Sequence, residues 1–318
     1  MNKNFIYIII TTILFSSMEI ALKFIAGDFH PVQMTFTRFL VGGIMLLPFA
    51  VSTLRKRRIH MKPKEFAPFA LSGFIGVTVS MTLYQMALTQ TQASIAAILF
   101  SGNPLFVMLF AYLLIKEPIH VRNIIALLFD VIGIVFIINP WNMRLSLTGV
   151  ILSLASTVIF ALYGVSGKKA SSQYGGVVNT CFGFLFGSAE MILLAALTHI
   201  SFVSDFLNSN GLSSFCNIPF LSGYSLGSLP IVLFVSIGVT GIGYACYFLA
   251  MEKTSANTVS LVFFFKPILA PALAFFLLKE TITLNSILGI LFILIGSLTN
   301  IVPGLLANRR AIPYQTDN

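Results

Sequence analysis

Long apolar runs separated by short polar stretches make up most of the chain. A helix needs about 20 mostly apolar residues to cross a bilayer, and runs of that length recur along the whole sequence. We predict ten membrane spans, at about 5–25, 33–52, 67–89, 93–114, 121–139, 147–167, 176–198, 226–250, 257–277 and 284–303. The longest loop, about 199–225, is too short for a soluble domain. The pattern therefore predicts an all-α integral membrane protein.

One apolar stretch occurs twice, because Thr254–Glu280 repeats Thr91–Glu117 after a shift of 163 residues. The same shift aligns Tyr84 with Tyr247, Phe100 with Phe263, Pro104 with Pro267, and Gly133 with Gly296. We therefore predict a first five-helix repeat at residues 1–140, a second at 141–304 and a cytoplasmic tail at 305–318. An odd number of spans makes the second repeat enter the membrane from the opposite side, which gives the inverted repeats of many secondary transporters.

The distribution of basic residues predicts the orientation in the membrane. The loop at 55–64 carries six basic residues, so we expect it on the cytoplasmic side. Alternation of the spans then places about fourteen basic residues inside and leaves only Arg144 and Lys279 outside. Both termini are therefore predicted to be cytoplasmic.

Composition supports a membrane protein and argues against several other classes. Hydrophobic residues make up 57% of the chain and charged residues 9%, whereas soluble proteins carry about 25% charged residues. The net charge of +9 does not indicate nucleic-acid binding, because the basic residues cluster in short loops between apolar runs. The sequence has no GxxxxGK[ST] phosphate loop, and its four histidines are widely separated. We therefore expect no enzyme activity, no metal and no cofactor.

Six ionisable residues fall inside the predicted spans, although a charge at the bilayer centre costs roughly 2.5–3.5 kcal/mol on insertion scales. They are Glu19, Lys23, Arg38, Asp130, Glu190 and Lys266. Three acids and three bases allow mutual neutralisation. Each residue therefore has both a structural and a functional interpretation.

Glu19 lies four residues before Lys23 on one helix face, and at a depth similar to that of Arg38 in the next span. One interpretation is a structural ion pair of Glu19 with Lys23 or with Arg38. The other is that Glu19 faces a transport pathway, where it takes up a proton or binds a cationic group of a substrate.

Lys266 lies in the middle of the ninth predicted span, directly before Pro267 and near Pro271. Its counterpart in the first repeat is Asn103, directly before Pro104. Proline removes a backbone donor, so we predict helix breaks at Pro104, Pro267 and Pro271. Discontinuous helices at matching positions of two repeats indicate a transporter site.

Two interpretations of Lys266 stay open: an ion pair with Asp130 or Glu190, or binding of a substrate carboxylate or other anion. Asp130 and Glu190 stand alone in apolar surroundings, which favours a role in helix pairing for both. Tyr84 and Tyr247 occupy matching mid-span positions. They either offer hydroxyl groups to a substrate or serve packing alone.

The chain resembles members of the drug/metabolite transporter (DMT) superfamily that have two EamA-type domains. The resemblance covers nearly the whole chain and rests on the order of short motifs. These are Pro104 followed by Lys116-Glu117, Pro267 followed by Lys279-Glu280, Gly133 and Gly296, Pro31 with Thr37-Arg38-Phe39, and Lys23.

The resemblance implies ten helices in two inverted repeats, a central site between the halves, and alternating access. Helices one, three, four, six, eight and nine line the cavity in the family, which implies that Glu19, Tyr84, Asn103, Tyr247 and Lys266 lie near the pathway. Family members move amino acids, other small metabolites or drugs, and many are exporters in bacterial inner membranes. Two features depart from the family pattern. The 199–225 loop is long, and Glu19 and Lys266 are not family motif residues.

We predict a multi-pass secondary transporter of the inner (cytoplasmic) membrane that moves a small, amino-acid-like or otherwise charged or zwitterionic metabolite. Its expected partners are this small-molecule substrate and the lipid bilayer, with no nucleic acid. Proton coupling, export and the oligomeric state are left open. The alternatives are a structural or sensory membrane protein without flux, and a flippase for a lipid-linked headgroup.

Overall fold

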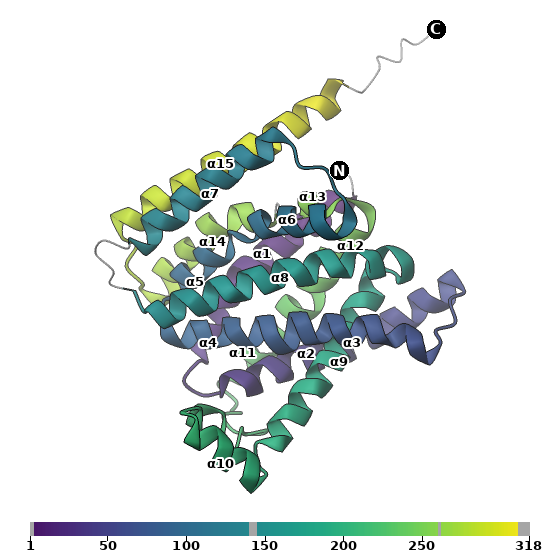
Figure 1. The fold of residues 1–318 in the computed structure, drawn as a ribbon, viewed down its shortest axis with the longest axis vertical. Coiled ribbons are helices and arrows are strands. Elements are labelled where there is room, and N and C mark those ends of the chain that lie inside the picture. Colours follow the sequence, from purple (N-terminus) through teal and green to yellow (C-terminus); the bar gives the residue numbers. More distant parts are fainter. Residues whose placement is uncertain (1–2, 140–144, 260–261, 311–318) are drawn as a thin grey trace.

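The computed structural model describes residues 3–139, 145–259 and 262–310, and these residues fold into helices joined by turns, with no strand among them (Figure 1). The expectation of an all-α protein is confirmed for this part of the chain. The helices of the first repeat are α1 (Lys3–Phe24), α2 (Pro31–Arg57), α3 (Ala67–Gly73), α4 (Thr82–Gln90), α5 (Ala93–Phe100), α6 (Asn103–Ile115) and α7 (Val121–Ile138). Those of the second are α8 (Leu147–Tyr174), α9 (Gly176–Leu197), α10 (Ser201–Ser209), α11 (Leu229–Leu233), α12 (Tyr244–Lys253), α13 (Ala256–Val259), α14 (Val262–Leu278) and α15 (Leu284–Arg310).

Eight helices of the described residues are long and apolar enough to cross a membrane. They correspond to the first eight predicted spans. The last two predicted spans, 257–277 and 284–303, coincide with the shorter apolar helices Phe265–Leu278 and Leu284–Gly296. The structure therefore supports a membrane protein, while the count of ten spans and the sidedness stay predictions.

Two spans contain a widened helical centre at matching places in the two repeats. A π-helix at Phe74–Met81 joins α3 to α4, and another at Phe234–Gly243 joins α11 to α12. Runs of π-helix are rare and often mark functional sites. Both lie next to the aromatic centre, a cluster of buried rings that includes Phe15, Phe100, Phe160, Tyr244 and Phe263.

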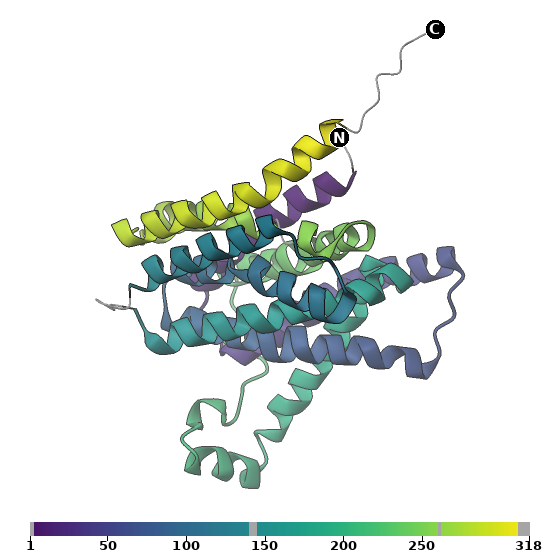
Figure 2. The ribbon, with the colours of Figure 1, turned by 45° about the horizontal axis from the view of Figure 1, so that its top comes forward.

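The helices α7 and α15 pack side by side along one edge of the bundle (Figures 1 and 2). A Cβ atom on Gly133 would lie 2.6 Å from the carbonyl oxygen of Gly289, and one on Gly296 would lie 2.7 Å from that of Ala126. Small residues allow membrane helices to approach closely, and these glycines do so here. Asp130 is buried in this interface, where its Oδ1 lies 3.2 Å from the Cβ position of Gly296.

The long loop predicted at 199–225 is folded, and it includes α10, which projects from the bundle (Figures 1 and 2). It is attached to the start of α2. The Gln33 side chain donates hydrogen bonds to the carbonyl oxygens of Phe220 (3.2 Å) and Ser222 (2.7 Å), and Thr37 hydrogen-bonds with Tyr224 at 2.7 Å. This end of α2 is therefore covered by a segment of the second repeat.

Candidate functional site

Glu19 and Lys266 form an ion pair inside the bundle. Lys266 Nζ on α14 lies 2.6 Å from Glu19 Oε1 on α1, and both side chains are at most 1% exposed. The Tyr84 hydroxyl on α4 donates a hydrogen bond to the same Oε1. A buried carboxylate is tolerated when it is paired and hydrogen-bonded, and this one is both. Three helices that are distant in sequence thus meet at one charged group.

Aromatic rings surround the Lys266 ammonium group. Its Nζ lies 4.7 Å from the centroid of the Phe100 ring, 5.6 Å from that of Tyr84 and 5.9 Å from that of Phe263. The negative faces of aromatic rings attract cations, so these rings stabilise the buried charge.

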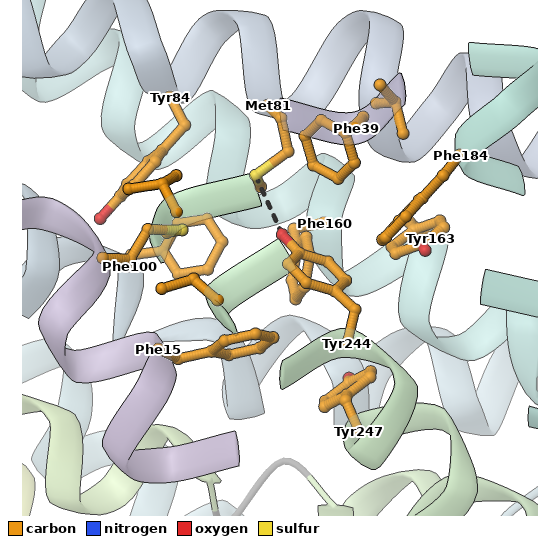
Figure 3. Close-up of a cluster of buried hydrophobic side chains, with 14 of the residues drawn as sticks. Phe15, Phe39, Met81, Tyr84, Phe100, Phe160, Tyr163, Phe184, Tyr244 and Tyr247 are labelled. Atoms are coloured by element: carbon orange, nitrogen blue, oxygen red, sulfur yellow. Dashed lines mark hydrogen bonds between the residues drawn. The ribbon is translucent and has the colours of Figure 1, made fainter. Parts of the chain in front are cut away.

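Residues of the aromatic centre contact their own counterparts in the other repeat. The Tyr244 hydroxyl donates to Met81 Sδ at 3.2 Å (Figure 3), and the ring centroids of Phe100 and Phe263 are 5.7 Å apart. Each pair is separated by the repeat shift of 163 residues. Equivalent residues touch only near the axis that relates two repeats, so this axis passes through the cluster. Sequence reasoning missed Tyr244, although its position opposite Met81 in the repeat alignment was a usable signal.

The two remaining predicted pathway residues lie in the same core without bonding to the ion pair. The Tyr247 hydroxyl is buried, has no hydrogen-bond partner among the described residues, and lies against Gly164. Asn103 is also buried, and its Nδ2 donates to the carbonyl oxygen of Thr157 at 3.2 Å. Of the five predicted residues, the structure therefore brings Glu19, Tyr84 and Lys266 into direct contact.

Arg38 is fully buried near this site and has no carboxylate partner among the described residues. Its Nη1 donates to Met18 Sδ at 3.2 Å, and its Cζ lies 4.7 Å from the centroid of the Phe39 ring. Nε and Nη2 have no hydrogen-bond partner among the described residues. The expected Glu19–Arg38 ion pair is therefore not formed, and Glu19 pairs with Lys266 instead.

The other expected ion pairs are also absent from the described part of the chain. Lys23 donates to backbone carbonyls rather than to Glu19. Asp130 lies in the α7–α15 interface, and Glu190 Oε2 accepts a hydrogen bond from the Thr78 hydroxyl at 3.0 Å. Neither carboxylate contacts Lys266, and neither forms an ion pair with any other basic residue that the structure describes.

Helix breaks were predicted at three prolines, and the structure shows continuous helix at two of them. In the first repeat the helix is interrupted after Phe100, and Pro104 follows as the second residue of α6. In the second repeat α14 continues through Pro267 and Pro271. Each proline there still removes one backbone donor, but the flanking turns keep the helical path.

Two polar clusters, related by the repeat, hold the turns at opposite ends of the bundle (Figure 1). The first clamp consists of Lys23 and Glu280 around the α4–α5 turn. Lys23 Nζ donates to the carbonyl oxygens of Leu88 (2.7 Å) and Thr91 (2.8 Å) at the end of α4. Glu280 accepts from the backbone N–H groups of Ala93 (2.8 Å) and Ser94 (3.0 Å) and from the Ser94 hydroxyl (2.6 Å) at the start of α5.

The second clamp consists of Lys168 and Glu117 around the α12–α13 turn. Lys168 Nζ donates to the carbonyl oxygens of Met251 (3.4 Å) and Thr254, and lies 3.9 Å from Glu117 Oε1. Glu117 accepts from the backbone N–H of Ala256 at 3.1 Å. In both clamps a lysine binds the exposed carbonyls at a helix end and a glutamate binds the free N–H groups at a helix start.

The glutamates of the clamps reach across the repeats, since Glu280 follows α14 of the second repeat and Glu117 follows α6 of the first. The preceding lysines, Lys116 and Lys279, adopt left-handed backbone conformations (φ 57° and 58°) that end these helices. The Lys-Glu motifs found in the sequence therefore have a structural role: the lysine terminates a helix, and the glutamate caps a helix of the other repeat.

Comparison with known proteins was made for sequence and for fold. The model of the EamA-like transporter family matches residues 2–139 and again residues 147–302. A Clostridium kluyveri protein described as an uncharacterized transporter is 35% identical over 308 residues, which cover 94% of this chain and 93% of that protein. An Archaeoglobus fulgidus protein with the same description is 24% identical and covers 92% and 97%. One solved crystal structure has a TM-score of 0.69 at 18% identity over 96% of this chain and 99% of its own, which shows a shared fold.

Proposed function

The chain belongs to the EamA-like transporter family of the drug/metabolite transporter superfamily, and on that premise we propose that it is a secondary transporter of a small charged metabolite in the cytoplasmic membrane. The observation that carries this proposal is the buried Glu19–Lys266 ion pair with the Tyr84 hydroxyl. Ionisable groups within a membrane are costly and are typically found on substrate or ion pathways. This one lies at the axis between the repeats, where transporters of inverted-repeat folds bind substrate.

Alternating access is supported by the two clamps. Each holds the turn between the third and fourth spans of one repeat, and each uses a glutamate of the other repeat. If the repeats are inverted, the clamps lie on opposite sides of the membrane. With both formed, the protein is closed on both sides, and release of one clamp at a time would open the centre to one side only.

The test is transport by purified protein in proteoliposomes. Vesicles are incubated with an isotope-labelled extract of small metabolites, and retained solutes are identified by mass spectrometry. We expect wild-type vesicles to enrich a small set of solutes relative to protein-free vesicles. The paired variant Glu19→Met/Lys266→Met, which removes both charges of the pair together, should lose this enrichment.

Glu190→Gln is the matched control, because it removes an intramembrane carboxylate that lies away from the ion pair, beside Thr78. This variant should retain the enrichment. Absence of any enriched solute with wild-type protein, or full enrichment with the paired variant, would contradict the proposed function.

A further inference from the structure

The centre of the molecule carries one more positive charge than negative charge. Glu19, Lys266 and Arg38 are all buried, and Glu19 is neutralised by Lys266. Arg38 interacts with Glu19 only as a more distant charge, because no hydrogen bond joins them. The carboxylates of Asp130 and Glu190 lie at other helix contacts. Within the described residues the guanidinium of Arg38 is therefore left without a counterion.

The Arg38 guanidinium cannot become neutral by losing a proton, so its positive charge stays buried. Burial of a charge is strongly unfavourable unless the charge is paired and hydrogen-bonded. The acceptor that Arg38 does have, the Met18 thioether, is a weak one. The group that is missing from this site is therefore a negatively charged acceptor.

The two nitrogens without a partner, Nε and Nη2, lie along one edge of the guanidinium. The N–H groups of that edge are parallel, and they match the two oxygens of a carboxylate in a bidentate pair. A single excess charge is balanced by a monoanion, whereas a phosphate monoester would bring a second negative charge without a cation to match it.

We propose that Arg38 anchors a carboxylate of the transported solute, and that the solute is a small organic monoanion with an apolar body. This inference rests on the proposed transport function. The apolar body follows from the rings near the anchor, since the Phe39 ring lies beneath the guanidinium. That ring packs against Phe184 (4.6 Å between centroids) and Tyr244 (5.7 Å), and Figure 3 shows these three rings. The solute carboxylate accepts hydrogen bonds from Nε and Nη2 of Arg38 while the Glu19–Lys266 pair stays intact.

This assignment changes the expectation that Glu19 and Lys266 bind the two ends of a zwitterion. Those two groups neutralise each other at 2.6 Å, so neither offers a free charge to a solute. Arg38 does. The net charge of the solute is the property that separates the two possibilities.

The experiment measures melting temperature of the purified full-length protein in detergent. The probes are benzoate, phenylacetate and 3-phenylpropionate, each paired with its carboxamide at the same concentration. The acids are expected to raise the melting temperature and the amides to leave it unchanged. Arg38→Lys keeps the positive charge but loses the two parallel N–H groups, so it should raise the apparent Kd roughly 10- to 100-fold. Arg38→Met should abolish the response.

Arg122→Met is the control, because Arg122 lies in the first turn of α7, away from this site. It should keep the wild-type response. A wild-type response in Arg38→Met, equal responses to acids and amides, or no response to any acid would overturn the anchor. If Arg38→Met does not fold, an unchanged Kd in Arg38→Lys overturns it. None of these results removes the transport proposal, which is judged separately by solute enrichment in proteoliposomes.

Discussion

At the residue scale, the Glu19–Lys266 pair has an energy that depends on both partners being present. Removing two charges from water costs several kcal/mol for each ion, and their attraction offsets this cost only while both remain. The Tyr84 hydroxyl adds a hydrogen bond to a charged acceptor, which is roughly twice as strong as a neutral one. The pair is therefore sensitive to the loss of one member and tolerant of the loss of both.

Glu19→Met or Lys266→Met alone should lower the free energy of unfolding by about 3–5 kcal/mol, because each leaves one buried charge unpaired. The double variant should be more stable than either single variant, since neither charge of the pair is left without its partner. Thermal melting of the three variants in one detergent measures the effect. Losses that simply add in the double variant would show that the two groups are not coupled.

Tyr84→Phe and Tyr247→Phe form a matched pair, because the two tyrosines are equivalent in the repeats. Tyr84→Phe removes the donor to Glu19 and should cost about 1.5–3 kcal/mol of stability, the usual value for a hydrogen bond to a charged group. Tyr247→Phe removes a hydroxyl that has no partner among the described residues, so it should be neutral or slightly stabilising. The same melting assay distinguishes them, and equal losses would contradict the assigned hydrogen bond.

At the element scale, the sequence predicted where helices lie better than how their ends are held. Apolar runs indicate membrane spans, because length and hydropathy are local properties. The Lys-Glu motifs were visible, but their partners were not, since Glu280 bonds to Ala93 across 187 residues of sequence. The continuous path of α14 through Pro267 and Pro271 was also hidden, because the flanking turns and neighbouring helices determine whether a proline breaks a membrane helix.

The same limit explains the candidate site. Four of the six ionisable residues are buried, as their place in apolar runs indicates, whereas Lys23 and Glu190 are only partly buried. The choice of Lys266 as the partner of Glu19 depends on the packing of α1 against α14. Lys23 shares a helix with Glu19 and was an equally good partner by spacing. It is instead directed to the carbonyls that end α4, where backbone acceptors would otherwise lack hydrogen bonds.

Weakening one clamp should open the molecule on one side. Glu280→Gln removes the charge that caps α5, and Glu117→Gln does the same for α13. Loss of charge-assisted hydrogen bonds worth roughly 1.5–3 kcal/mol would raise the open population about 10- to 100-fold. Single cysteines at Thr91 and Thr254, in a background without native cysteines, report each opening through the rate of labelling by a maleimide.

We expect Glu280→Gln to accelerate labelling at position 91 and to leave position 254 unaffected, with the reverse for Glu117→Gln. Each variant is thus the control for the other. Equal acceleration at both positions would indicate general loosening of the fold, and no acceleration at either would show that the clamps do not restrict access.

At the scale of the whole molecule, the fold is nearly symmetric and its chemistry is not. Met81 meets Tyr244 and Phe100 meets Phe263 at the axis, so both repeats contribute to the aromatic centre. The charged groups break this symmetry, because Asn103 stands at the position equivalent to Lys266. A symmetric scaffold suits two exchanging conformations that open to opposite sides, and an asymmetric set of charges suits a solute that has no symmetry itself.

The predicted inversion of the repeats leads to a test of sidedness. The basic loop at 55–64 follows the second span of the first repeat, and its counterpart, the folded segment with α10, follows the second span of the second repeat. Five predicted spans separate the two, so we expect them on opposite sides, with the positively charged loop in the cytoplasm. Native Cys216, partly exposed near α10, is a ready probe for the other side.

In cells that produce the protein with Cys216 as its single cysteine, a membrane-impermeant maleimide should label the protein without permeabilisation. With only Lys62→Cys, labelling should require permeabilisation. Labelling of both positions from the same side would rule out inverted repeats and, with them, two clamps that face opposite solutions.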